Sequence, residues 1–179
     1  LSLQKLSSAG LITGTFSGTS STTLIQLERL GSSLPTSNAP SPGNYTFVIP
    51  FNPTNTPSAT VPGGHGFGTG SISAGGLLTL SGVLGDGTSF TASEQVTRLG
   101  RWPLFVELDE GKGALWGWIT YNTNQAQKLE SSLTWIRTAD GSAPFYPAGV
   151  TNQASFAMSP YNPEPGTRAV NWVYGLVRL

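Results

Sequence analysis

The sequence predicts an all-β fold, a closed or nearly closed antiparallel β-barrel of about 10–12 strands arranged largely as an up-and-down meander. A β-sandwich is the alternative. Apolar and polar side chains alternate with a period of two along most of the chain, which is typical of half-buried antiparallel strands. Charged residues make up only 10% of the sequence, against about 25% in ordinary soluble domains, so the Lys and Glu that usually coat helices are scarce.

Short alternating segments bounded by turn residues make up the predicted strands. They are Leu1–Leu6, Leu11–Ser17, Thr22–Arg29, Tyr45–Phe51, Gly66–Ser73, Leu77–Leu84, Thr88–Thr97, Trp102–Leu108, Ala114–Asn122, Lys128–Thr138, Gln153–Met158 and Ala169–Val177. The rest of the sequence carries no long stripe with a 3.6-residue period. We therefore expect at most one or two short helical turns, and residues 125–131 are the only tempting segment.

Tight turns connect several of these strands and predict antiparallel neighbours. The turn residues are Ala74-Gly75-Gly76, Gly85-Asp86-Gly87 and Ala139-Asp140-Gly141. The consecutive strands between residues 66 and 138 indicate a meander, which suits a barrel because closure hides the sheet edges. Longer loops are expected at residues 31–44, 52–64, 140–151 and 159–166, which are rich in Ser, Pro and other turn residues.

A single domain is expected over residues 1–179, because a chain of this length supports one sizeable core. The alternation has already begun at Leu1, which indicates a domain cut from a longer exported protein. The sequence has no cysteine, so it offers no disulfide or thiolate site. Nine basic residues balance nine acidic ones, and neither kind is clustered in the sequence. We therefore expect neither nucleic acid as a partner nor insertion into a membrane.

Several short motifs occur along the chain, and the order in which they occur is a more specific indication of relationship than any single motif. They are Tyr45-Thr46-Phe47-Val48-Ile49-Pro50, Gly66-Phe67-Gly68-Thr69, Gly82-Val83-Leu84-Gly85-Asp86-Gly87-Thr88, Trp102-Pro103-Leu104-Phe105-Val106, Gly111-Lys112-Gly113, Gly117-Trp118-Ile119, Leu133-Thr134-Trp135-Ile136-Arg137 and residues 145–152. Over residues 42–152 the chain resembles a β-rich domain that recurs near the C-terminus of large exported multimodular proteins of environmental bacteria. The resemblance implies a secreted or cell-surface location and a modular setting.

Catalytic and metal-binding motifs are weak in this sequence. His65 is the only histidine and lies among glycines, whereas a Ser-His-Asp site or a metal centre needs further partners. Glu107, Asp109 and Glu110 could supply paired carboxylates, but residues 109–113 are typical of a polar hairpin turn. Residues 64–68 resemble a phosphate loop but precede a strand instead of a helix, so they indicate a strand bend. We predict no catalytic residue, metal or cofactor.

Aromatic residues are the more informative candidates for ligand binding. Trp116 and Trp118 share one face of a strand, and Leu115 and Ile119 share the other. Either the tryptophans fill the core, or they form an exposed surface on which sugar rings can stack.

Other aromatic residues divide between the core and the loops. Trp102, Trp135 and Trp172 lie within strand patterns and are predicted core residues. Tyr146 and Tyr161, on proline-containing loops, are candidates for contact with a partner.

The leading functional hypothesis is a non-catalytic extracellular module for adhesion or for surface or fibre assembly, with polysaccharide binding as its sharper form. Polysaccharide or neighbouring protein subunits would be its partners. The first alternative is a barrel that binds a small ligand in its interior, and the second is a glycan hydrolase that uses carboxylates. Residues 171–179 could also pair with the sheet edge of another subunit instead of completing their own barrel.

Overall fold

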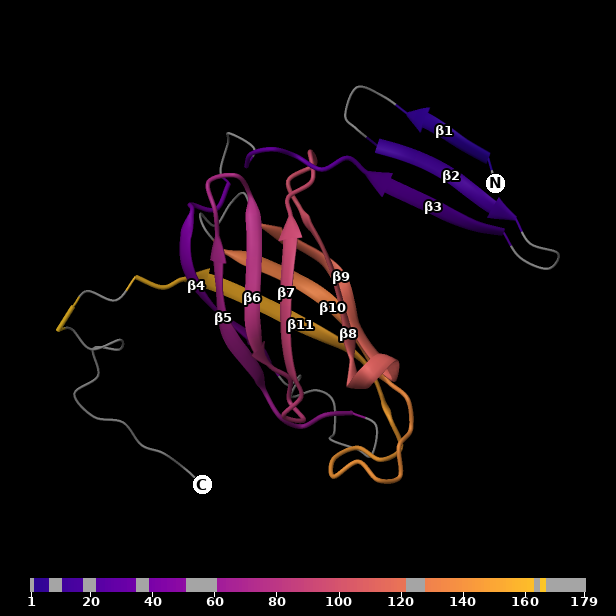
Figure 1. The fold of residues 1–179 in the computed structure, drawn as a ribbon, viewed down its shortest axis with the longest axis vertical. Coiled ribbons are helices and arrows are strands. Elements are labelled where there is room, and N and C mark those ends of the chain that lie inside the picture. The colour runs from indigo at the N-terminus through magenta and orange to yellow at the C-terminus, as the bar shows by residue number, and fades with distance from the viewer. Residues whose placement is uncertain are drawn as a thin grey trace.

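Eight antiparallel strands form one sheet that curls into a nearly closed barrel, and three further strands form a separate sheet (Figure 1). The computed structural model describes residues 2–6, 11–17, 22–34, 39–50, 61–121, 128–162 and 165–166. The separate sheet contains β1 (Ser2–Leu6), β2 (Leu11–Ser17) and β3 (Thr22–Glu28). The barrel contains β4 (Gly43–Ile49), β5 (Gly66–Ile72), β6 (Leu77–Val83), β7 (Ser89–Gln95), β8 (Trp102–Leu108), β9 (Gly113–Tyr121), β10 (Leu129–Arg137) and β11 (Val150–Pro160).

Two four-stranded meanders build the barrel, and the order of strands in the sheet is β7-β6-β5-β4-β11-β10-β9-β8. The strands β4 to β7 form the first meander and β8 to β11 form the second. They are joined where β11 pairs antiparallel with β4, with Ala157 opposite Val48 and Pro160 opposite Tyr45. The strands β7 and β8 are consequently the two ends of the sheet, although they follow one another in the chain.

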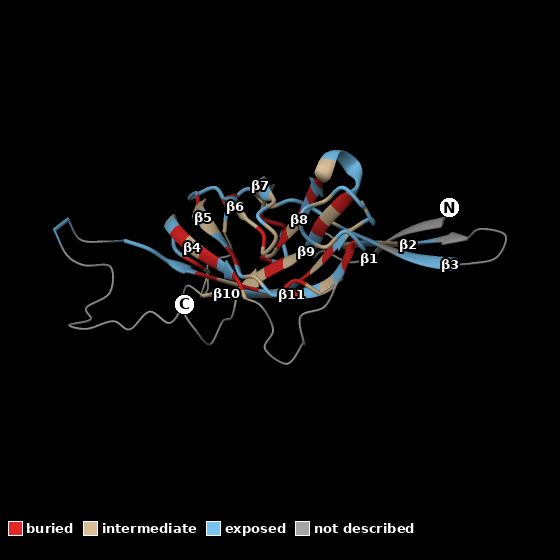
Figure 2. Ribbon diagram, turned by 90° about the horizontal axis from the view of Figure 1, so that it is seen from below, coloured by how far each residue is buried: buried red, intermediate tan, exposed pale blue. Residues whose placement is uncertain are grey.

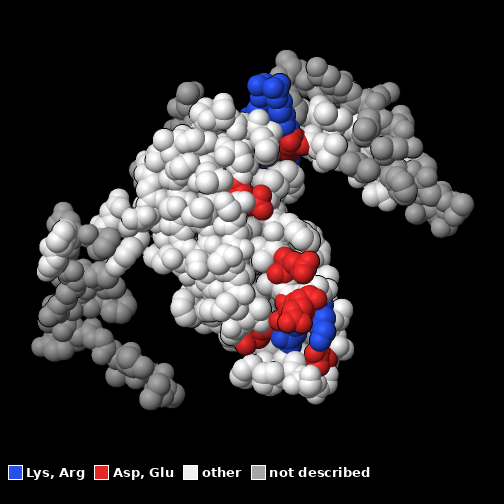
Figure 3. Space-filling model, viewed as in Figure 1, with Lys and Arg blue, Asp and Glu red and all other residues white. Residues whose placement is uncertain are grey.

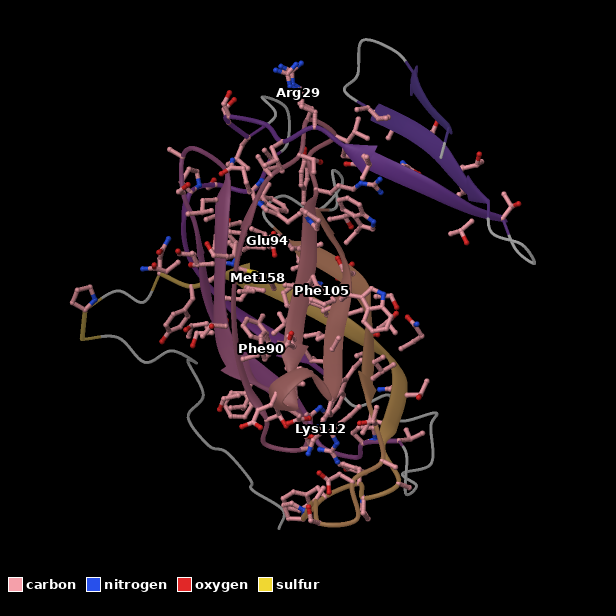
Figure 4. All side chains as sticks on the ribbon, turned by 45° about the vertical axis from the view of Figure 1, so that its right-hand side comes forward. Arg29, Phe90, Glu94, Phe105, Lys112 and Met158 are labelled. Atoms are coloured by element: carbon pink, nitrogen blue, oxygen red, sulfur yellow. The ribbon has the colours of Figure 1, made fainter. Side chains whose placement is uncertain are left out.

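The β7–β8 seam is the boundary at which these two ends meet. The chain turns between them with the N–H of Thr97 donating to the carbonyl of Arg101 at 2.8 Å. Farther along the seam, the backbone of Phe105 favours the charged form of the Glu94 carboxylate, and Figure 4 shows both residues on the adjoining strands. Backbone ladders join the other neighbouring strands of the barrel, whereas no ladder joins β7 to β8.

Buried side chains from alternate positions of the strands fill the barrel, as the alternating colours of Figure 2 show. Phe47 stacks on Phe156 with ring centroids 5.4 Å apart and also contacts Phe90, at 5.8 Å. It lies over Gly68 and Gly82, where an added Cβ atom would come within 2.5 Å of its ring. The glycines of β5 and β6 thus leave the space that the large aromatic side chain occupies.

The three-stranded sheet is connected to the barrel at the turn between β7 and β8. Leu30 forms a bridge with Thr97, and the N–H of Arg98 donates to the carbonyl of Arg29 at 2.9 Å. The carboxylate of Glu28 pairs with the guanidinium of Arg101. The chain that leaves β3 therefore adds a short antiparallel contact to this end of the barrel.

The predicted all-β class and near-closure are confirmed. In the described part of the chain the barrel itself has eight strands, because β1 to β3 pair only with one another. The predicted strand at residues 169–177 lies outside the described residues, and β11 instead joins the two meanders. A single 3-10 turn, η1 (Asp109–Gly111), is the helical element of the described residues, and none of their helices is long and apolar enough to cross a bilayer.

Two of the predicted tight turns are present, whereas residues 139–141 begin the longer β10–β11 loop. The N–H of Gly76 donates to the carbonyl of Ser73 at 2.9 Å, which closes the β5–β6 hairpin. The N–H of Gly87 donates to the carbonyl of Leu84 at 3.0 Å in the β6–β7 hairpin. Both glycines have positive φ angles, of 81° and 89°, a conformation that glycine adopts without steric cost.

Candidate functional site

The two tryptophans of β9 face outward. Leu115 and Ile119, on the opposite face of the strand, are fully buried in the core. Trp116 is 36% exposed and lies directly opposite Phe105 of β8, which is 64% exposed. Trp118 is half-buried and lies opposite Pro103. We refer to Phe105, Trp116 and Trp118 as the outer aromatic surface.

Arg101 fixes one edge of the outer aromatic surface. Its guanidinium carbon lies 4.2 Å from the centroid of the Trp118 ring, a cation–π contact. The same guanidinium pairs with the carboxylate of Glu28, whose side chain is almost fully buried. The orientation of Trp118 is therefore held by a residue that is itself anchored to β3.

Polar side chains lie beside the aromatic ones on the outside of the barrel. Thr134 of β10 is directly opposite Trp116. The amide of Gln153 donates to its hydroxyl at 2.8 Å, and the hydroxyl of Ser132 donates to the amide oxygen of Gln153 at 3.2 Å. Exposed aromatic rings thus adjoin a row of hydrogen-bonding groups on β10 and β11.

The two predicted loop tyrosines lie apart from each other and play different structural roles. The hydroxyl of Tyr146 accepts a hydrogen bond from the N–H of Gly63 at 2.9 Å, and its ring packs against the core. Tyr161 is 40% exposed, and its N–H donates to the carbonyl of Asn44 at 2.9 Å. They flank opposite ends of the 11-residue strand β11, which spans about 35 Å. The four candidate residues therefore do not form one site.

The other predicted tryptophans and acids can also be placed. Trp102 and Trp135 are buried in the core as predicted, whereas Trp172 lies outside the described residues. Strand β8 ends at Leu108, so Asp109 begins the expected polar turn and does not share a strand face with Glu107. Among the residues that the structure describes, no group of three or more His, Asp or Glu side chains is placed to hold a metal ion.

The glycines around His65 serve strand packing. His65 is exposed and immediately precedes β5. A Cβ atom at Gly66 would come within 2.8 Å of the carbonyl oxygen of Val83, and one at Gly68 within 2.3 Å of the carbonyl oxygen of Ser81. The glycines among residues 64–68 therefore allow two strands to approach closely, and residues 66–68 form the start of β5.

A cluster of charged residues that sequence reasoning did not single out lies at one end of the barrel. Figure 3 shows acidic and basic side chains gathered beside η1, at the lower right. The guanidinium of Arg137 donates to the carboxylate of Asp86 at 2.7 Å, and their side chains are only 9% and 1% exposed. Arg137 also donates to the carbonyl oxygens of Phe145 and Tyr146. A buried ion pair thus ties the β6–β7 turn to the β10–β11 loop.

Lys112 and Asp140 extend this cluster toward solvent. The ammonium of Lys112 lies 3.2 Å from the carboxylate of Asp140, which also accepts hydrogen bonds from the hydroxyl and N–H of Ser142. These hydrogen bonds from Ser142, followed by the interaction with Lys112, lower the pKa of Asp140 to about 2. Asp140 therefore remains charged throughout the neutral and mildly acidic range.

A cavity of about 440 Å³ opens within the charged cluster, and we refer to it as the end cavity. Its lining includes Asp86, Thr88, Asp109, Glu110, Lys112, Arg137, Thr138, Asp140, Pro144 and Phe145. These residues come from the β6–β7 turn, the β8–β9 turn, the end of β10 and the β10–β11 loop. In an up-and-down meander every second connection lies at the same end, so the strand order could have indicated that these three connections converge.

The comparisons with known proteins give no family to which the chain can be assigned. No protein-family model matches the sequence, and no curated protein and no solved structure is similar to it.

Proposed function

We propose that this domain is a non-catalytic binding module of an exported or cell-surface protein and that its outer aromatic surface binds polysaccharide. The observation that carries the proposal is the exposure of Phe105 and Trp116, side by side on β8 and β9. The low charge of the sequence and its resemblance to domains of exported proteins support the location.

Sugar rings offer apolar C–H faces that stack on aromatic side chains and hydroxyl groups that form hydrogen bonds. Both requirements have counterparts here. The aromatic rings lie on two adjacent strands. Thr134 presents a polar group next to Trp116, and Gln153 is hydrogen-bonded to Thr134 on the following strand. The buried side chains of Leu115 and Ile119 anchor the strand that bears the tryptophans, so the outward position of the rings is defined by the core.

The filled interior of the barrel disfavours the small-ligand alternative. An interior site needs space that apolar side chains do not occupy. Tyr45, Phe47, Phe90, Trp102 and Phe156 all point into the core and are at most 5% exposed.

Sedimentation of the protein with insoluble polysaccharides tests the proposal. The panel should include cellulose, chitin, xylan and mannan, and the variant should combine Trp116→Ala with Trp118→Ala. We expect at least one polymer to retain the wild-type protein and the double variant to bind it about tenfold more weakly, because two stacking contacts are lost. Circular dichroism should show that the variant keeps its β-sheet spectrum.

Phe67→Ala provides a control, because Phe67 is an aromatic residue about as exposed as Phe105 and lies on β5, four strands away from β9 in the sheet. Its removal should leave binding unchanged. Equal binding by the tryptophan double variant, or an equal loss in the Phe67 variant, would contradict the proposed role of the outer aromatic surface.

A further inference from the structure

A row of outward-facing residues crosses the sheet from β8 to β11. Phe105 of β8 lies opposite Trp116 of β9. Thr134 of β10 lies opposite Trp116 on its other side and is itself opposite Gln153 of β11. We refer to Phe105, Trp116, Thr134 and Gln153 as the cross-strand row. Because neighbouring strands are about 4.8 Å apart, the cross-strand row is about 14 Å long, with aromatic residues at one end, polar residues at the other and no charge.

Gln153 is exposed, yet two residues of β10 hold its side chain in place. Its amide nitrogen donates to the hydroxyl of Thr134 at 2.8 Å, and its amide oxygen accepts from the hydroxyl of Ser132 at 3.2 Å. A long exposed side chain ordinarily loses rotamer freedom when a ligand orders it. Since Gln153 is already ordered by these two hydrogen bonds, contact with a ligand costs it less entropy.

The Gln153 amide also keeps hydrogen-bonding capacity for a ligand. A primary amide has two N–H donors, and its oxygen has two lone pairs. Thr134 and Ser132 use one of each, and Gln153 forms no further hydrogen bond with the residues that the structure describes. One N–H and one lone pair therefore remain. They suit the hydroxyl groups of a sugar, because a hydroxyl group both donates and accepts.

The exposed aromatic area continues across the strands more than it continues along β9. Along β9, Trp118 is half-buried, and the guanidinium carbon of Arg101 lies 4.2 Å from the centroid of its ring. Across the strands, Phe105 is 64% exposed and lies directly beside Trp116. A ligand that stacks on Trp116 therefore finds its next contacts along the cross-strand row.

An extended sugar chain fits the spacing of the cross-strand row. A β-1,4 linkage keeps such a chain extended, and its advance per sugar is close to the distance between neighbouring strands. Successive sugars can thus lie over successive members of the row, with C–H faces on the aromatic end and hydroxyl groups at the polar end. An α-1,4-linked chain coils, so its sugars do not keep this register.

We propose that the cross-strand row is the track on which a neutral, extended, β-1,4-linked polysaccharide lies, and that Gln153 is the specificity-determining residue at its polar end. This inference rests on the proposed function, and it adds the direction, the length and the linkage of the bound chain.

Titration of the whole chain with soluble oligosaccharides, followed in ¹H–¹⁵N NMR spectra, tests the track. The probes are cello-oligosaccharides of two to six glucose units and malto-oligosaccharides of the same lengths, which differ from them only in the configuration of the linkage. Cellobiose should shift the indole N–H of Trp116, and longer cello-oligosaccharides should also shift the side-chain amide of Gln153. The affinity should rise about tenfold from the disaccharide to the tetrasaccharide, because hydrogen bonds to Gln153 are added, and then level off. Malto-oligosaccharides should bind more weakly at every length.

Gln153→Met separates the polar end from the aromatic end. Methionine has a similar length and lacks the amide, so the variant should bind cellobiose as the wild type does and lose the gain up to the tetrasaccharide. Gln26→Met is the matched control, because Gln26 is an exposed glutamine on β3 in the other sheet. Its affinity should equal that of the wild type at every length.

The outcomes separate this inference from the proposed function. If cello-oligosaccharides shift the Trp116 indole but Gln153→Met keeps the full dependence on chain length, the track is wrong and the proposed function stands. Equal affinity for the two series of oligosaccharides would also overturn the track alone. If no oligosaccharide shifts the Trp116 indole and the tryptophan double variant binds insoluble polysaccharide as the wild type does, the proposed function fails and the track fails with it.

Discussion

The contacts of the buried ion pair between Asp86 and Arg137 predict how much stability the protein loses when one partner is removed. Asp86 makes two separate interactions, since one carboxylate oxygen pairs with Arg137 at 2.7 Å and the other accepts the N–H of Thr88 at 2.9 Å. Asp86→Asn can keep the second interaction through its amide oxygen. It removes the negative charge from beside a guanidinium that is only 9% exposed.

Loss of one partner of a buried ion pair costs about 3–5 kcal/mol, because the remaining charge is left uncompensated. Arg137 retains its hydrogen bonds to two loop carbonyls and its distant contact with Asp109, so we expect the low end of that range, about 3 kcal/mol. With a urea dependence of about 2 kcal/mol per M, the midpoint of unfolding should fall by about 1.5 M.

Urea unfolding followed by tryptophan fluorescence measures this change, and a second substitution identifies its cause. Arg137→Met added to Asp86→Asn removes the unpaired charge and leaves a side chain that packs against apolar neighbours. The double variant should therefore be more stable than Asp86→Asn alone. A loss below about 1 kcal/mol for Asp86→Asn, or no recovery in the double variant, would refute the assignment of this pair as a buried ionic link.

Two further predictions concern the barrel itself. Gly68→Ala should destabilise the protein by at least about 2 kcal/mol in urea unfolding, because its Cβ atom would lie 2.3 Å from a backbone oxygen. Gly141→Ala is the control and should be nearly neutral, because open space surrounds Gly141. Equal losses of stability in the two variants would contradict the close packing of β5 at Gly68. Burial raises the pKa of Glu94 above its ordinary value of 4.5, so the folded protein binds this proton more readily than the unfolded chain does. The free energy of unfolding should therefore fall as the pH rises from about 4.5 through the raised pKa. Glu94→Gln should flatten that part of the stability profile, and an unchanged slope would rule out the effect.

The strands were predictable because each is short, amphipathic and bounded by turn residues. The segment from Trp102 to Leu108 was predicted with the same bounds as β8, and its buried positions follow the alternation. The core positions of Trp102 and Trp135 followed from the same pattern. Whether Trp116 and Trp118 faced inward was not predictable from alternation alone, because both faces of β9 carry large apolar residues and only the folded sheet shows that Leu115 and Ile119 occupy the interior.

Long-range pairing was less accessible from the sequence. Nothing in the pattern of β11 marks it as the neighbour of β4, because the two strands lie about 100 residues apart and their pairing depends on how the whole sheet curls. The same limit applies to the charged cluster. Asp86, Asp109 and Arg137 each resemble ordinary turn or strand-end residues, and they meet only because three connections converge at one end of the barrel.

The β7–β8 seam gives the barrel a mechanical property that a continuous cylinder of ladders lacks. A cylinder in which every neighbouring pair of strands is laddered can change its girth only by breaking rows of backbone hydrogen bonds, whereas here no backbone ladder joins the two margins β7 and β8. The strand that carries Phe105 is one of those margins. The outer aromatic surface therefore lies beside the boundary of the barrel that no backbone ladder closes.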